Sequence, residues 1–231
     1  MRINPGMSNG KYCMEVVSKF ILSMPRSISL NEFCNEITVC VSSKYEQFGI
    51  SKIQLMEHPE NRMTASAIIY SAYWNQIWLV GDCQCLVNGT VHENPKPQEW
   101  RIAEKRSSFL RKEIARGTSI KEMQKHDLGR DHIIKDLVSC LPEQNIEYPV
   151  IDGFPIPNNE VKTIDVSNIH GEIVLASDGY PFLKPTLQES EDALRQQLDN
   201  DPLCIETFKA TKGLMDGNKS FDDRSYIRFK I

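Results

Sequence analysis

The sequence contains no run of apolar residues long enough to cross a membrane, because the ~18 consecutive apolar residues of a spanning helix occur nowhere in its 231 residues. Its first ten residues, MRINPGMSNG, also lack the basic-then-apolar order of a signal peptide. Basic and acidic residues number 27 and 31, and a net charge of −4 gives no general attraction to nucleic acid or to an anionic membrane. These absences predict a cytoplasmic protein without a nucleic-acid or membrane partner.

The sequence is also poor in residues spaced for zinc. Its seven cysteines are scattered, mostly among apolar neighbours, which in a reducing compartment is typical of small core residues rather than of a disulfide framework. Cys83 and Cys85 form a C-x-C pair with no second pair of matching spacing, and the five histidines form no H-x-x-x-H group. A zinc site is therefore disfavoured, while the 40% of apolar residues suffices for a hydrophobic core.

What the sequence does contain is an alternation of helical and strand patterns. Amphipathic spacing predicts helices over residues 11–24, 29–49, 186–198 and 202–215, and two or three more between about 98 and 141. Apolar and β-branched runs predict hairpins over residues 63–89 and 160–179, with a last strand in 222–231. This order predicts an α+β fold, in which helices cover an antiparallel sheet system, formed by a single domain over residues 1–231.

Carboxylates stand at the ends or breaks of three of these strands. Asp82 lies within LVGDCQ, Asp178 ends the apolar run of IVLASDG, and Asp222 and Asp223 precede the last strand in DDRSYIRFKI. Each one alone is typical of a turn. Together they suggest a site for Mg²⁺ or Mn²⁺, because these hard cations bind several carboxylate oxygens held on separate elements.

The order and context of these motifs resemble the type 2C family of metal-dependent Ser/Thr protein phosphatases. The family has a strand pair that starts with Thr-Ala and ends in Val-Gly-Asp-Ser-Arg, similar to residues 64–84 here with Cys83 and Gln84 in place of Ser and Arg. A later strand of the family ends in Ala-Ser-Asp-Gly, which residues 176–179 match here. The family's Asp-Asp/Asn-x-Ser/Thr is similar to residues 222–225. The resemblance implies a four-layer antiparallel β-sandwich flanked by helices, with residues 98–142 as a helical insertion.

The resemblance also implies a two-metal centre that activates a water for attack on a phosphoserine or phosphothreonine. The implied metal ligands are Asp178, Asp222, Asp82 and the backbone carbonyl of Gly6, binding one or two Mn²⁺ or Mg²⁺ ions rather than a full set. The family's Asp-Gly-x-Gly-Gly turn is similar to NPGMSNG, but its metal-bridging Asp falls on Pro5, whose side chain cannot bind a metal. The family's first strand, with the Arg that receives the substrate phosphate, has no counterpart.

Three functions remain open at this point. The first is metal-assisted hydrolysis of a phosphoprotein, impaired by the missing Asp. The second is a catalytically inactive pseudophosphatase that binds a phosphoprotein or regulatory protein, and the unpaired sheet edge left by the missing strand predicts a homodimer. The third is an amide hydrolase with an N-terminal nucleophile, which has similar layered sheets, but no Thr, Ser or Cys near the start has the context of a processed nucleophile.

Overall fold

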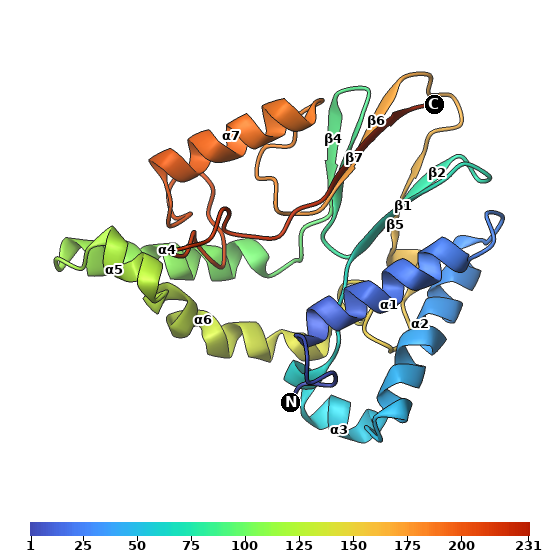
Figure 1. Cartoon of the computed structure of the whole chain (residues 1–231), viewed down its shortest axis with the longest axis horizontal. Coiled ribbons are helices and arrows are strands. Elements are labelled where there is room, and N and C mark those ends of the chain that lie inside the picture. The colour runs from blue at the N-terminus through green and yellow to red at the C-terminus, as the bar shows by residue number, and fades with distance from the viewer. The chain divides into compact units, whose positions relative to one another are not determined.

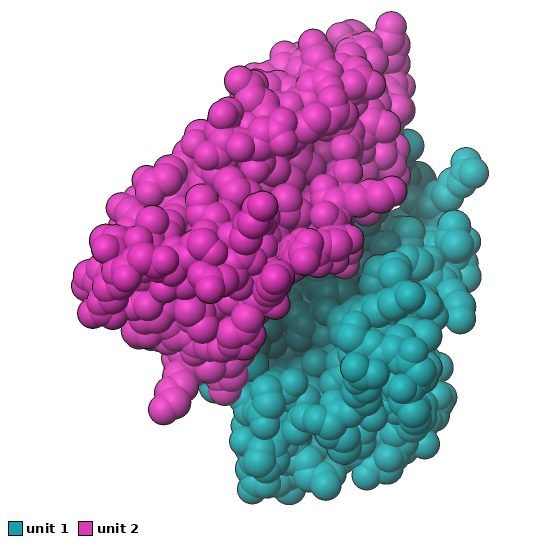
Figure 2. All heavy atoms as spheres, turned by 60° about the vertical axis from the view of Figure 1, so that its left-hand side comes forward, with its two compact units in different colours: residues 1–83, 141–169 teal, residues 84–140, 170–231 magenta.

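The computed structural model describes all residues from Met1 to Ile231, and the chain forms two compact units. Unit 1 comprises Met1–Cys83 and Leu141–Ile169, and unit 2 comprises Gln84–Cys140 and His170–Ile231 (Figure 2). Each unit contains one antiparallel sheet and its own helices (Figure 1). The predicted α+β class with two antiparallel sheets flanked by helices is confirmed. No helix of the chain has both the length and the apolar character needed to span a membrane.

Unit 1 is a three-stranded sheet in the order β1-β2-β5, with helices packed against it. Its core joins Phe33 of α2 to Trp78 of β2, with ring centroids 6.2 Å apart. Side chains cap the first two helices: Ser8 caps α1, and Ser29 forms a capping box with Glu32 at the start of α2. The elements of unit 1 are α1 (Asn9–Ser23), α2 (Leu30–Gln47), α3 (Lys52–Glu57), β1 (Ala67–Ser71), β2 (Gln76–Val80) and β5 (Lys162–Asp165), with short 3-10 turns at Pro59–Asn61, Leu141–Glu143 and Asn158–Glu160.

Unit 2 is a four-stranded sheet in the order β4-β3-β6-β7. Helix α7 packs on it through Leu194 and Leu198, which share a core with Leu86 and Val174 of the strands. Helices α4 and α6 pack on each other within residues 98–142, the segment predicted to be helical. The elements of unit 2 are β3 (Gln84–Val87), β4 (Thr90–Glu93), α4 (Glu99–Ala115), α5 (Ile120–Lys125), α6 (Leu128–Ser139), β6 (Glu172–Ala176), α7 (Leu187–Asn200) and β7 (Tyr226–Lys230).

The hairpin predicted over residues 63–89 is confirmed in its pairing, because β1 and β2 are antiparallel neighbours, but its second strand does not continue to residue 87. The chain breaks at Gly81 (φ +90°), a left-handed conformation that strands exclude, so β2 and β3 lie in different sheets. The hairpin predicted over residues 160–179 is wrong: β5 pairs with β2 in unit 1, whereas β6 lies between β3 and β7 in unit 2. The local strand patterns were sufficient to locate the strands but not their partners.

The helix predicted over residues 202–215 is also wrong, because the chain from Asp201 to the start of β7 is irregular. The Asp201 carboxylate accepts the backbone N–H groups of Ile205, Glu206 and Thr207 at 2.7–3.0 Å, which closes a loop where a helix would continue. The buried Arg106 holds the same loop from α4, by donating to the carbonyls of Leu203 at 2.8 Å and Ala210 at 3.1 Å. This 25-residue loop carries most of the site described next.

Candidate functional site

The Asp178-Gly179 turn follows β6 in unit 2 and is held by hydrogen bonds on both sides. The buried Gln84 of β3 donates its amide to the carbonyls of Ser177 at 2.9 Å and Tyr180 at 2.8 Å. The backbone N–H of Ser225 donates to the Ser177 hydroxyl at 2.9 Å. Gln84, which stands where the resembled family has Arg, therefore fixes the strand end that presents Asp178.

The same turn meets the segment that contains Asp222. A Cβ atom added at Gly179 would lie 2.3 Å from the carbonyl oxygen of Asp223, a distance that only glycine allows. Because β6 and β7 pair antiparallel with Ala176 opposite Tyr226, the segment after β6 and the segment before β7 lie at one end of the sheet (Figure 1). The structure thus brings together the chain segments of two sequence-predicted ligands, Asp178 and Asp222.

The carboxylate of Asp222 already has a cationic partner. Its Oδ1 accepts a hydrogen bond from the Lys212 ammonium and a second from the backbone N–H of Asp223 at 2.8 Å. The Asp222 side chain is 19% exposed, and that of Lys212 is 41% exposed. We refer to this contact as the Lys212–Asp222 pair. It neutralises the charge that would attract a divalent cation.

A second ionic group joins α7 to both carboxylate segments. Glu191 of α7 accepts from Arg224 Nε and Nη2, each at 2.7 Å, and from the Tyr180 hydroxyl at 2.7 Å. Tyr180 lies two residues after Asp178, and Arg224 lies two residues after Asp222. We call Glu191 with its two partners the Glu191 clamp, and its contacts restrain both segments.

The clamp shifts the pKa values of its members. The two bonds from Arg224 are the main reason that the Glu191 pKa falls from 4.5 to about 2. Burial, followed by the hydrogen bond to Glu191, raises the pKa of Tyr180 to about 12. At neutral pH the clamp therefore consists of a carboxylate, a guanidinium and a neutral phenol, the states in which all three bonds are satisfied.

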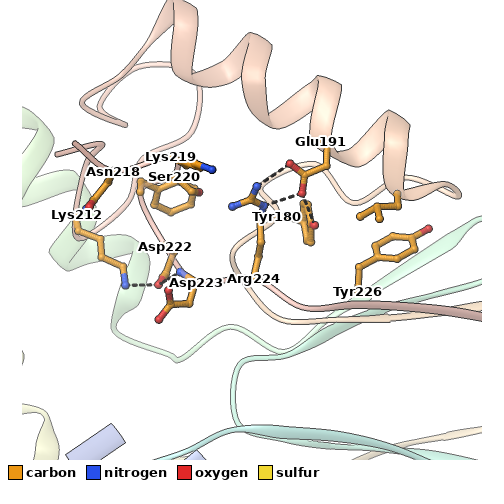
Figure 3. Close-up of a pocket in the computed structure, with 12 residues that line it drawn as sticks. Tyr180, Glu191, Lys212, Asn218, Lys219, Ser220, Asp222, Asp223, Arg224 and Tyr226 are labelled. Carbon is orange, nitrogen blue, oxygen red and sulfur yellow. Dashed lines mark hydrogen bonds and ion pairs between the residues drawn. The ribbon is translucent and has the colours of Figure 1, made fainter. Parts of the chain in front are cut away.

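A pocket of about 740 Å³ lies between α7 and the 212–226 segment. Figure 3 shows the Lys212–Asp222 pair and the Glu191 clamp as two separate groups along this pocket. The hydroxyl of Ser220 is buried in its wall without a hydrogen-bond partner. The lining carries three cationic and three acidic side chains, so its formal charges cancel. The lining residues are Tyr180, Leu187, Glu191, Lys212, Asn218, Lys219, Ser220, Phe221, Asp222, Asp223, Arg224 and Tyr226.

The other two predicted ligands, Asp82 and Gly6, belong to unit 1. Asp82 follows β2, and its Oδ1 accepts the hydroxyl of Ser66. A Cβ at Gly81 would lie 2.2 Å from the Ser66 hydroxyl oxygen, so this approach requires glycine and explains the Gly-Asp step. Gly6 follows Pro5 in a tight turn closed from Met7 N–H to the Asn4 carbonyl. That Asp82 and Gly6 bind metal ions together with Asp178 stays a prediction.

The side chains as arranged do not fit a two-metal centre. No group of three or more His, Cys, Asp or Glu side chains in the structure is arranged to hold a metal ion. The Asp222 carboxylate is engaged by Lys212, and Pro5, on which the resemblance places the family's bridging Asp, has no side chain that binds a metal. We therefore derive no catalytic step through a metal ion.

Sequence reasoning found the carboxylates but missed the residues that surround them. Lys212 lies inside the predicted helix 202–215, and Glu191 lies inside the predicted helix 186–198. Lys212 contacts Asp222, which lies 10 positions further along the chain, and Glu191 contacts Arg224, which lies 33 positions further along. No local spacing signals such pairs, which only the fold brings together.

Comparison with known proteins gives a limited result. No protein-family model matches the chain, and no curated protein matches it. Among solved structures, the catalytic domain of the serine threonine protein phosphatase PstP in complex with two manganese ions is 15% identical with a TM-score of 0.37, over 81% of this chain and 70% of that one. The Mycobacterium tuberculosis phosphatase PstP/Ppp is 14% identical with a TM-score of 0.38, over 84% and 76%. Because both TM-scores are low, this likeness does not establish a common fold.

Proposed function

We propose that this chain is a phosphatase-like protein of the type 2C family in which metal-assisted hydrolysis is impaired so far that no turnover above background remains, and which serves as a binding or regulatory module for a phosphorylated protein. The family assignment is supported by the ordered motifs around Asp82, Asp178 and Asp222. It is also supported by the placement of Asp178 and Asp222 at one end of a four-stranded antiparallel sheet. The two solved structures, both described as phosphatases, carry no weight in this assignment.

The loss of efficient hydrolysis is supported chiefly by the Lys212–Asp222 pair. A carboxylate that already bonds an ammonium has less charge to offer a Mn²⁺ or Mg²⁺ ion. Pro5 adds to this, since it takes the place of the family's bridging carboxylate. In enzymes generally, removal of one charge-stabilising element costs about 10²–10³ in rate, and here two such elements are altered.

The test is phosphate release from an aryl phosphate and from a phosphothreonine peptide, with excess Mn²⁺, by the wild-type chain and by Asp178→Asn side by side. We expect the two proteins to release phosphate at the same background rate, while the phosphopeptide binds to the wild-type chain. Release that the wild type shows and Asp178→Asn lacks would mean that the carboxylates still form a working centre, and the binding role would be wrong.

A further inference from the structure

Lys212 is held in place by the backbone on both sides of it. The carbonyl of Thr211 accepts from Arg130 of α6 at 3.1 Å. A Cβ at Gly213 would lie 2.8 Å from the Leu203 carbonyl oxygen, so the chain there is closely packed. The next residue, Leu214, donates its N–H to the carbonyl of Pro202 at 2.8 Å. The ammonium therefore reaches Asp222 from a fixed anchor rather than from a freely moving loop.

The other two cationic residues that line the pocket, Arg224 and Lys219, form no ion pair with Asp222. Arg224 is bound through two nitrogens to Glu191. Lys219 lines the same pocket and carries the same charge, but no ion pair joins it to Asp222, whose cationic partner is Lys212. The pocket thus offers one lysine that is paired with the predicted ligand and a second lysine that is not.

From this arrangement we infer that Lys212 is a built-in counter-ion, which takes the place of a divalent cation on Asp222 and keeps metal affinity low at this end of the sheet. The inference rests on the proposed function, which identifies Asp222 as the position of a metal ligand. The ammonium on Oδ1 neutralises the Asp222 charge that would attract a divalent cation, and the two cations repel each other at contact distance. Metal binding at Asp222 is therefore weaker while Lys212 stays in place.

The experiment measures Mn²⁺ affinity directly, from the paramagnetic resonance signal of free Mn²⁺ in titrations of the full chain. Lys212→Met removes the ammonium but keeps the unbranched apolar part of the side chain, and Lys212→Arg keeps the charge. Lys219→Met is the matched control, because it removes one charge from the same pocket without releasing Asp222. Thermal unfolding of each variant verifies that it is folded.

We expect Lys212→Met to bind Mn²⁺ about fivefold or more tighter than the wild type, from loss of the competing pair and its repulsion. Lys212→Arg is expected to stay near the wild-type affinity, and Lys219→Met to change it by less than about twofold, since solvent screens an exposed charge. The inference is overturned if Lys212→Met does not tighten binding, or if Lys219→Met tightens it equally.

This outcome is separate from that of the proposed function. Phosphate release that depends on Asp178 in the wild type would refute the proposed absence of turnover, whatever the effect of Lys212→Met on Mn²⁺ affinity. Conversely, a wild-type chain without turnover whose Mn²⁺ affinity is unchanged in Lys212→Met would leave the proposed function standing and reject Lys212 as the counter-ion.

Discussion

Replacing Glu191 by Gln tests whether the Glu191 clamp holds the two carboxylate segments of unit 2. The amide keeps the size of the side chain but removes the charge that Arg224 binds through two nitrogens. The amide also replaces one acceptor oxygen by an NH₂ donor, so it cannot accept all three hydrogen bonds that the two carboxylate oxygens accept from Arg224 and Tyr180. The Arg224 guanidinium, whose side chain is 25% exposed, then loses its counter-charge.

The size of the effect follows from the Glu191 pKa. The fall of the Glu191 pKa from 4.5 to about 2 means that the folded state favours the ionised carboxylate by at most about 3 kcal/mol. The Glu191 side chain is 29% exposed, so solvent screening reduces the free energy of unfolding that it contributes to about 1–2 kcal/mol. Because the pKa in the folded chain lies below the unfolded value, this contribution is complete above about pH 4.5 and is lost as the pH falls towards about 2.

Urea unfolding of wild type and Glu191→Gln measures this difference. We expect a loss of about 1–2 kcal/mol near pH 7 that shrinks to less than half at about pH 3. Asp192→Asn is the control on the same helix. Asp192 makes exposed contacts, an ion pair with Arg195 and a hydrogen bond from Gln188, and its substitution is expected to cost at most about 0.5 kcal/mol. A Glu191→Gln effect that equals the Asp192→Asn effect, or that does not change between the two pH values, would refute the clamp.

Three other predictions concern packing and burial. Gly179→Ala is expected to lower the free energy of unfolding by about 1–3 kcal/mol in urea titrations, because its methyl group would overlap the facing backbone; an unchanged midpoint would contradict this contact. Arg62→Met is expected to cost about 3–5 kcal/mol, since it leaves the fully buried Asp152 without its ion-pair partner, and the double variant with Asp152→Asn should recover part of the loss. Burial raises the pKa values of Cys13 and Cys204 to about 12, so both thiols should resist a thiol reagent in the native chain at pH 8 and react in urea; rapid native labelling of either would be the contrary result.

The helices and turns that depend on local signals could be predicted from the sequence. Capping boxes at Ser29, Ser119 and Thr186 mark the starts of three helices, and all three are present. The Asn88-Gly89 turn between β3 and β4 follows from the preference of these two residues for left-handed backbone, which both adopt. Such features need only neighbouring residues, so a sequence pattern is sufficient.

The features that the sequence did not predict depend on distant residues. The 201–225 loop has amphipathic spacing, yet Asp201 and the buried Arg106 hold it out of a helix, and Arg106 lies 97 positions before Leu203. The same holds at the site, where the end of a buried strand predicts Asp178 but nothing local predicts that Lys212 reaches Asp222. Tertiary contacts decide these cases, and local propensity is overridden.

The most direct test of the account is a diffraction experiment on crystals of the wild-type chain grown with excess Mn²⁺, using the anomalous signal of manganese to locate the ion. The account predicts no manganese peak beside Asp222, and a Lys212 ammonium bonded to its carboxylate. Manganese peaks coordinated by Asp178 and Asp222, with Lys212 turned away, would contradict both the counter-ion role and the impaired metal centre.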